Sequence, residues 1–312
     1  MEVGWLFLAG LPAFLYALTN HIDKHLLEKH FKCDDGVATL VLISALVSVV
    51  ALPAILFFGT TEVIPENQTH LLVFVFLGFL HVALLWFYLL ALSEEDTVTI
   101  IVFYSILPVL GLIFANLFLG EVLLPMQLIA MAIIIVAVLI ISVERNGEKK
   151  GFRIRWRSAV LMCLASLCWA LGDTVFKAVA IEENVWRTLF WEHVVMFSIG
   201  ALMFAFGPKL RKQLGFILRE NSTRIISINM TNEVLYIVAN VMSAFPLMLV
   251  QVAAVHLVQA SQPIWVFLIA LFLMYTGMAN ERFTREQLVQ KSVATTLAVA
   301  GMFLLELYTP SA

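Results

Sequence analysis

Charged residues are scarce in this sequence: Asp, Glu, Lys and Arg make up 13% of its 312 residues, against about 25% in soluble domains. Hydrophobic residues make up 62%, which is more than a soluble fold can hide from water. The formal net charge is only −3, so no strong field of either sign indicates a nucleic-acid partner. The composition therefore predicts an integral membrane protein.

Cysteine is also rare, and the three that occur, Cys33, Cys163 and Cys168, show no C-x-x-C spacing. A disulfide framework and a zinc site are both disfavoured by this pattern. Neither H-E-x-x-H nor G-x-S-x-G occurs in the chain, so nothing indicates an enzyme. No organic cofactor or metal is expected.

Long apolar runs dominate what remains. A helix needs about 20 mainly apolar residues to cross the hydrocarbon core of a bilayer. Ten segments meet this requirement: 3–26, 36–58, 70–92, 97–119, 124–143, 158–180, 185–207, 224–247, 250–277 and 287–307. The connections are short apart from 59–69, 144–157 and 208–223, which are predicted to be loops. The predicted fold is all-α, with ten transmembrane helices.

The distribution of Lys and Arg predicts how such a protein is oriented. If ten segments cross, sixteen of the 19 basic residues lie in connections or at segment ends on one side and Arg187 alone lies on the other, while Lys24 and Lys177 lie within helices. Because basic residues favour the cytoplasmic side, both termini are predicted to be non-cytoplasmic. The basic connection 144–157 is expected to touch anionic lipid headgroups.

The two halves of the sequence resemble each other weakly. Segment 17–24 aligns with segment 170–177 at an offset of 153, and later positions align at offsets of 155 and 160. The aligned pairs are Asn20 with Asp173, Lys24 with Lys177, Tyr104 with Gln259, Pro108 with Pro263, and Glu121 with Glu281. This pattern predicts a first repeat at 1–143, a linker at 144–157 and a second repeat at 158–312. Since five helices are an odd number, the second repeat enters the membrane inverted, an arrangement typical of transporters.

A family resemblance rests on the segment from Pro108 through Gly120-Glu121 to Gln127. It is similar to the P…GE…Q pattern of the EamA-type branch of the drug/metabolite transporter superfamily. The resemblance implies a ten-helix carrier of small molecules in a bacterial or archaeal plasma membrane. The second half departs from the pattern, because Asn280 stands before Glu281 where glycine is expected. The family also implies cytoplasmic termini, and here the charge distribution, which predicts the reverse, is preferred.

Polar groups within apolar helices mark candidate transport residues, because each costs about 2.5–3.5 kcal/mol on insertion scales. Asn20 and Lys24 are four residues apart, as are Asp173 and Lys177, so each pair shares a helix face and is predicted to line a gate. The Asp173–Lys177 pair would be neutral in charge. The alternative is that both lysines extend to the headgroups.

Two acidic residues lie deeper in their segments. Glu233 is predicted near the middle of the bilayer, and Glu192 is also submerged. Since removal from water favours the protonated form of a carboxyl group, both are candidates for proton coupling. The alternative for each is a hydrogen bond between helices.

The remaining candidates are aromatic, histidine and amide side chains that would line an amphipathic cavity. They are His81, Trp86, Tyr104, Trp169, Asn240, His256 and Gln259. Pro108 and Pro263 are predicted to bend their helices during gating. A second cluster has metal-like spacing but runs from a helix end into a loop, where solvated charges are common; it comprises His21, Asp23, His25, Glu28 and His30.

Together these features predict a secondary active transporter of small organic metabolites, amino acids or drug-like compounds, with proton coupling as a further hypothesis. A carrier of nucleotide sugars or sugar phosphates is an alternative, although it should present several cations to phosphate. A membrane receptor or scaffold is an alternative of another class. The expected partners are a small-molecule substrate and the lipid bilayer; the sequence specifies no oligomeric state.

Overall fold

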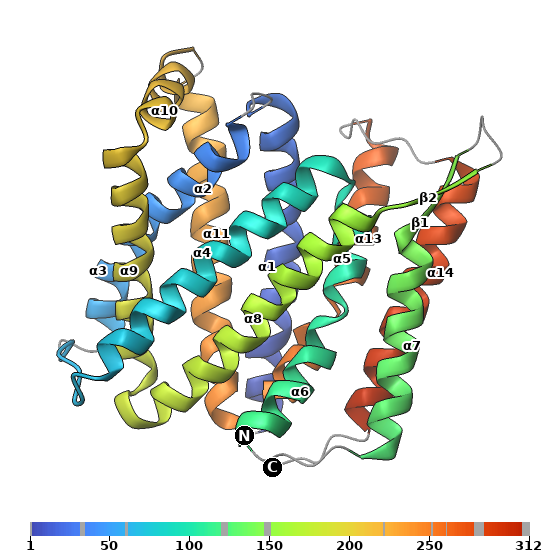
Figure 1. Cartoon of the computed structure of the whole chain (residues 1–312), viewed down its shortest axis with the longest axis horizontal. Coiled ribbons are helices and arrows are strands. Elements are labelled where there is room, and N and C mark those ends of the chain that lie inside the picture. The colour runs from blue at the N-terminus through green and yellow to red at the C-terminus, as the bar shows by residue number, and fades with distance from the viewer. Residues whose placement is uncertain are drawn as a thin grey trace.

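The structure, a computed structural model, describes residues 2–31, 35–59, 62–119, 124–146, 151–220, 222–250, 252–259, 261–277 and 284–307. Helices make up almost all of this part of the chain (Figure 1). The elements are α1 (Glu2–Lys29), α2 (Gly36–Val47), the 3-10 turn η1 (Ser48–Val50), α3 (Ala51–Phe58), α4 (His70–Glu94), α5 (Thr97–Tyr104), α6 (Leu107–Leu119), α7 (Pro125–Ser142), β1 (Val143–Asn146), β2 (Gly151–Ile154), α8 (Trp156–Glu183), α9 (Val185–Phe206), α10 (Pro208–Glu220), α11 (Ser222–Leu249), α12 (Val252–Gln259), α13 (Gln262–Tyr275) and α14 (Arg285–Leu307).

Each of the ten apolar segments corresponds to one helix or to a run of consecutive helices. Within the described residues, six spans are long and apolar enough to cross a membrane: Gly36–Phe58, His70–Glu94, Thr97–Phe118, Trp156–Glu183, Val185–Phe206 and Ile225–Leu249. Gln262–Tyr275 is a shorter apolar helix. An integral membrane protein is thus supported, while the number of ten crossings stays a prediction.

The outer surface of the bundle is strongly apolar. Phe57, Phe206 and Tyr275 are each more than 80% exposed, although water would strongly oppose such exposure of large side chains. Hydrocarbon solvates these side chains, so the same surface is stable against lipid tails. The polar groups lie inside instead, where helices must provide their hydrogen-bond partners.

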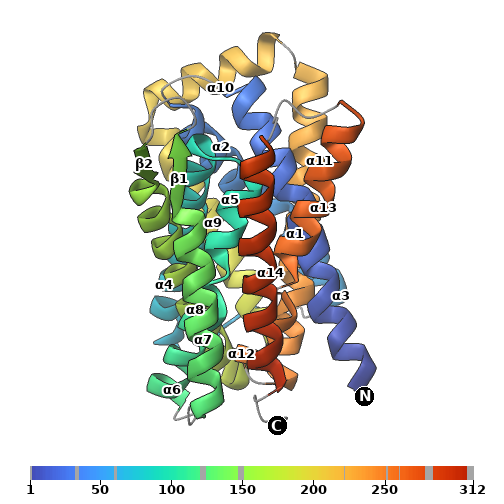
Figure 2. The same cartoon turned by 90° about the vertical axis from the view of Figure 1, so that its right-hand side faces the viewer.

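Packing joins helices that are far apart in the sequence. α1 packs along α11, α4 packs along α8, α2 packs on α9, and α7 lies beside α14. Figure 2 shows α7 and α14 side by side on the face of the bundle turned toward the viewer. The first two pairs each combine a helix from residues 1–143 with one from residues 158–312, so the two parts of the chain form one interlocked bundle.

Two predicted spans are broken near their middle. The span 97–119 divides into α5 and α6 at Ser105 and Ile106, and the span 250–277 divides into α12 and α13. Pro108 and Pro263 each occupy the second position of the later helix, where the missing N–H of proline removes no helical hydrogen bond. α5 packs against α13 and α6 against α12, which places the two breaks close to each other.

The connection between α8 and α9 is a single residue, Asn184. Its N–H donates to the Ala180 carbonyl at the end of α8, and its side chain accepts from the Arg187 N–H at the start of α9. Asn184 has φ 77°, a left-handed conformation that asparagine tolerates better than most residues. The chain therefore reverses direction with both helix ends capped.

Two connections predicted as loops contain regular structure. The segment 208–223 contains α10, which runs across the end of the bundle opposite the termini (Figure 2). The linker 144–157, predicted as a loop, contains most of an antiparallel pair of short strands, β1 and β2, while the fold class remains all-α. α10 was not predicted because the segment is too short and too charged to span a bilayer, although its apolar residues gather on one face of a helix.

Figure 1 shows the N- and C-termini at one end of the bundle, with α10 and the strand pair at the other. The basic connections 144–157 and 208–223 thus share one face, as the charge distribution requires. Which face meets the cytoplasm stays a prediction. Gly120, Glu121, Asn280 and Glu281, from the family pattern, lie outside the described residues, as does the Gln127 side chain.

Close helix contact at Gly200 provides a test of the packing. A Cβ atom there would lie 2.9 Å from the Ala45 Cβ and the Leu46 backbone nitrogen on α2, so Gly200→Ala should force α9 away from α2 and lower stability by about 1–3 kcal/mol. Gly172→Ala is the control, because its Cβ meets nothing within 4 Å. Thermal unfolding in detergent measures both; equal midpoints for the two variants would contradict this packing.

Candidate functional site

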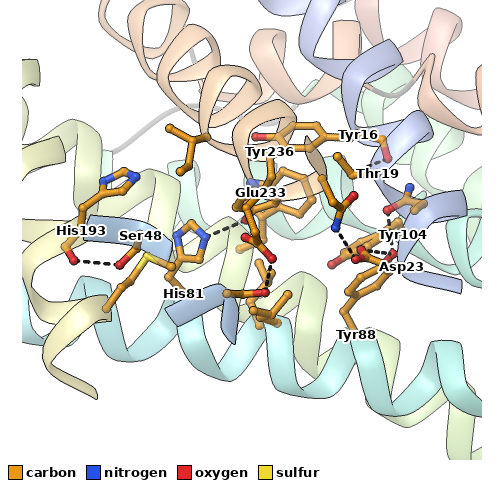
Figure 3. A pocket seen from close by; sticks show the side chains of 18 of the residues that line it. Tyr16, Thr19, Asp23, Ser48, His81, Tyr88, Tyr104, His193, Glu233 and Tyr236 are labelled. Atoms are coloured by element: carbon orange, nitrogen blue, oxygen red, sulfur yellow. Dashed lines mark hydrogen bonds between the residues drawn. The ribbon is translucent and has the colours of Figure 1, made fainter. Parts of the chain in front are cut away.

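A cavity lined by both apolar and polar side chains lies between the helices, with about 730 Å³ of space between its atoms when the open space at its mouth is included. Residues from α1, α4, α8, α9 and α11 converge on it, with contributions from α2, η1, α5 and α13. Figure 3 shows several of these side chains directed toward one another. The lining residues that the argument uses are Tyr16, Asn20, Asp23, Ser44, His81, Tyr88, Tyr104, Trp169, Asn232, Glu233 and Tyr236.

Asp23 is held at one side of this cavity by neutral donors. Its carboxylate accepts hydrogen bonds from the Asn232 amide at 2.6 Å and from the Tyr88 hydroxyl at 3.2 Å. The Tyr88 hydroxyl lies closer to the Asn20 carbonyl oxygen, at 2.8 Å. These bonds join α1, α4 and α11 around a carboxyl group that is 8% exposed.

Glu233 lies next to Asn232 on α11 and lines the same cavity. Its carboxyl group accepts a hydrogen bond from the Ser44 hydroxyl on α2, and the residue is 5% exposed. Two acidic side chains therefore meet in one cavity, and both have neutral hydrogen-bond partners.

A second chain of hydrogen bonds passes through His81. One ring nitrogen lies 2.7 Å from a Glu192 carboxylate oxygen, and the other lies 2.7 Å from the Tyr236 hydroxyl. These contacts connect α9, α4 and α11. Glu192 faces an adjoining cavity that also contains Asp173 and Asn240.

Asp173 pairs differently from the sequence prediction. Its carboxylate lies 2.7 Å from the Nε2 atom of His256 on α12, whereas the sequence predicted a pair with Lys177. Lys177 donates instead to the Val250 carbonyl at 2.8 Å. A contact between residues 83 positions apart depends on how α8 and α12 pack, which spacing along one helix cannot reveal.

Lys24 makes the matching contact in the first part of the chain. Its Nζ donates to the carbonyls of Leu92 and Glu95 at 3.0 and 2.8 Å, at the end of α4. Lys177 meets the carbonyl just beyond the end of α11 in the same way. Cations favour helix C-termini, where carbonyls lack helical partners, so each aligned lysine caps a helix end.

The other candidates are distributed around these features. His256, Gln259, Pro108 and Pro263 line a third cavity near the two helix breaks. Trp86 is partly buried and packs against the largest hydrophobic cluster. The residues with metal-like spacing do not converge in the described part of the chain, since Asp23 faces the cavity while His21 contacts the Val266 carbonyl on α13.

Sequence reasoning overlooked several lining residues, notably Tyr16, Tyr88 and Asn232. A signal was available on α1, where Tyr16, Asn20 and Asp23 recur at the spacing of one helix face. Tyrosine is also common at membrane interfaces, so its presence in these helices does not by itself indicate a cavity.

The short connection between α4 and α5 is fixed by a buried ion pair between Asp96 and Lys291. Asp96 caps α5 by accepting from the Thr99 N–H at 3.0 Å and pairs with Lys291 of α14. Burial raises the pKa of Asp96, but the Lys291 charge and the hydrogen bonds from Lys291 and Thr99 outweigh it, so the pKa lies below its ordinary value. The charged form is therefore part of the folded structure.

The comparisons with known proteins address the first part of the chain most directly. Residues 3–143 match the EamA-like transporter family. The match confirms the resemblance found at Pro108 and indicates a membrane transporter. This family consists of transporters, so enzymatic activity is not indicated.

A solved structure titled "Crystal structure of protein" is similar over 96% of this chain and 99% of its own, with a TM-score of 0.54 and 15% identity. At that identity the likeness concerns the fold alone. A comparison with curated proteins found no match.

Removing the Asp96 charge should destabilise the protein. Asp96→Asn keeps an acceptor for Thr99 but leaves Lys291 without its buried counter-charge, which should lower the free energy of unfolding by about 3 kcal/mol. Because folding lowers the Asp96 pKa, this contribution is complete above about pH 4, the ordinary value, and is lost as pH falls through the folded value.

Thermal unfolding in detergent, over a series of pH values from neutral into acid, measures this effect. The difference between the midpoints of wild type and variant should be largest near neutral pH and should shrink as the pH falls through the folded pKa. Asp35→Asn is the control, since the Asp35 side chain makes no capping hydrogen bond to α2. A difference that persists unchanged in acid would exclude a role for the Asp96 charge.

Proposed function

We propose that the whole chain is a secondary active transporter that moves a small organic metabolite, amino acid or drug-like compound by alternating access. The observation that carries this proposal is the pair of broken helices, α5/α6 and α12/α13, which together line the third cavity. Discontinuous helices at the interface of two repeats are typical of substrate sites in secondary transporters. The breaks fall at positions that align at the sequence offset of 155.

The helix packing supports two inverted repeats of five helices. Under exchange of the repeats, α1 corresponds to α8 and α11 corresponds to α4. The packing of α1 on α11 is then equivalent to the packing of α8 on α4, and both contacts are extensive. The end caps made by Lys24 and Lys177 are exchanged in the same way.

Departures from this symmetry support alternating access. α4 packs extensively on α9, whereas the equivalent contact of α11 with α2 is sparse. An inverted-repeat transporter has two states related by exchanging the repeats, so unequal contacts of equivalent helices are expected in either one.

Proton coupling is proposed to involve Glu233, with Glu192 as a second candidate. Glu233 lies in the central cavity, where a proton and a substrate would compete for the same carboxyl group. Glu192 already contacts His81 at 2.7 Å, which makes it less available to a substrate than Glu233.

Uptake into proteoliposomes tests the transport proposal. A pool of amino acids, amines and drug-like compounds should include at least one that accumulates under a pH gradient, and Glu233→Gln should abolish gradient-driven accumulation. Glu182→Gln is the matched control, since that side chain is 67% exposed at the end of α8. Accumulation that persists in Glu233→Gln would remove this residue from coupling, and absence of any transport would favour the scaffold alternative.

The orientation proposed from the basic residues places both termini outside the cytoplasm and the face with α10 against anionic lipid of the inner leaflet. Alkaline phosphatase fused to the C-terminus should then be active, and a fluorescent protein fused there should be dark. Fusions inserted at Gly215 in α10, on the opposite face, should give the reverse pattern. Fluorescence from the C-terminal fusion would instead support the family's usual orientation.

A further inference from the structure

We infer that the central cavity binds an organic cation, namely a protonated primary or secondary amine attached to an apolar or aromatic body. This inference rests on the proposed transport function and specifies its substrate class. Three independent features of the cavity carry it: the sign of its charge, its aromatic wall and its unpaired amide groups.

The charge of the cavity is acidic. Asp23 and Glu233 line it, Asp173 and Glu192 line the adjoining cavity, and in the part of the chain that the structure describes neither Lys nor Arg lines any of the three cavities. Lys24 and Lys177 donate to main-chain carbonyls, and Lys24 also pairs with Glu28. A phosphate or carboxylate substrate would therefore find neither Lys nor Arg among the described residues that line these cavities.

The four acidic side chains differ in whether a neighbouring side chain can balance their negative charge. Glu192 and Asp173 each contact a histidine at 2.7 Å, whereas Asp23 and Glu233 contact hydroxyl and amide groups. A buried carboxylate without a counter-charge is strongly disfavoured. A substrate ammonium group placed between Asp23 and Glu233 would supply that counter-charge.

The wall of the cavity is a continuous run of aromatic rings. Tyr16 lies 5.5 Å from Trp169 and 5.6 Å from Tyr236 between ring centroids. Tyr104 extends the run, at 5.4 Å from Trp169 and 5.9 Å from Tyr88. Such rings attract cations through their faces and provide contact area for an aromatic or apolar body.

Two amide atoms in the same cavity lack hydrogen-bond partners. They are the Asn232 Oδ1 and the Asn20 Nδ2 atoms, on residues that are 3% and 5% exposed. A buried polar atom without a partner is unfavourable. An ammonium N–H can donate to Asn232 Oδ1, which a quaternary ammonium cannot do, and Asn20 Nδ2 can donate to a hydroxyl or carbonyl oxygen on the same compound.

The cavity therefore combines acceptors for a charged N–H group with aromatic surface around it. Asn232 connects these features, because its Nδ2 atom donates to Asp23 while its Oδ1 atom stays available. This arrangement favours a ligand that has a positively charged hydrogen-bond donor at one end and an apolar or aromatic body at the other.

A series of probes with one ring and different head groups tests this inference on the unmodified protein. The probes are 2-phenylethylammonium, 2-phenylethanol and phenylacetate, with tetraethylammonium as a cation that cannot donate. Isothermal titration calorimetry in detergent should show the amine binding at least about tenfold more tightly than the alcohol or the acid, a difference of about 1.4 kcal/mol. Tetraethylammonium should bind more weakly than the amine.

Variants identify where the amine binds. Asp23→Asn and Glu233→Gln should each weaken amine binding by about tenfold or more while leaving the weaker binding of 2-phenylethanol unchanged. Glu182→Gln should change neither. The probe series needs no variant, so it decides the question even if a substituted protein fails to fold.

The outcomes separate this inference from the transport proposal. Binding of the amine without uptake of any compound would support the cation site and refute transport. Uptake of neutral or anionic compounds, with phenylacetate bound as tightly as the amine, would support transport and overturn the cation site. Failure of the amine to bind up to about 10 mM, a free energy weaker than about −3 kcal/mol, would also overturn it.

Discussion

A hydrocarbon exterior offers no hydrogen-bond partner, and the rest of this structure follows from that constraint. The helices satisfy their own main chains, so side chains such as Phe57 and Phe206 can face outward. Polar side chains must then find partners within the bundle. Asp23, Glu192 and Asp173 all do so across helix boundaries, which means that the polar groups define which helices meet.

The same constraint explains why irregular main chain is found beside cavities. Between α5 and α6, and again between α12 and α13, helical hydrogen bonding stops, and the freed groups need shorter-range bonds or polar surroundings. The Ser105 N–H bonds the Val102 carbonyl and the Ser261 N–H bonds the Val258 carbonyl, so tight turns replace part of the lost helix. The third cavity lies against both breaks.

Much of the fold could be predicted because a bilayer imposes a fixed length on apolar helices. The positions of the helices followed from local sequence, whereas for Pro108 and Pro263 the sequence predicted bends and the structure has breaks just before both prolines. The formation of α10 and of the β1–β2 pair did not follow from local sequence, because both lie in polar connections that this length rule does not describe. The packing of α1 on α11 and of α4 on α8 depends on contacts between segments that are distant in the sequence. The weak similarity between the two halves indicates which helices are equivalent, but not which helices are in contact.

The candidate site was partly predictable for a related reason. Glu233, Asn20 and His81 stand out as polar groups in apolar helices, and the structure brings all three to one cavity. Tyr16 and Tyr88 were missed because tyrosine is unremarkable in such helices. The partner of Asp173 was predicted wrongly, since a lysine four residues away is close in sequence while His256 is close only after folding.

The lysine caps also affect how the bundle can deform. Lys24 extends from α1, which packs on α11, to the end of α4, which packs on α8; Lys177 extends from α8 to the residue after α11. The α1/α11 pair and the α4/α8 pair are thus fastened to each other near both ends, each time by an ammonium group and helix carbonyls. Separating the pairs at one end exchanges those bonds for bonds to water, which changes the free energy of each charged hydrogen bond by about 1.5–3 kcal/mol. In the proposed alternating-access cycle, release of the lysine contact at one end would leave the lysine contact at the other end as the pivot between the two helix pairs.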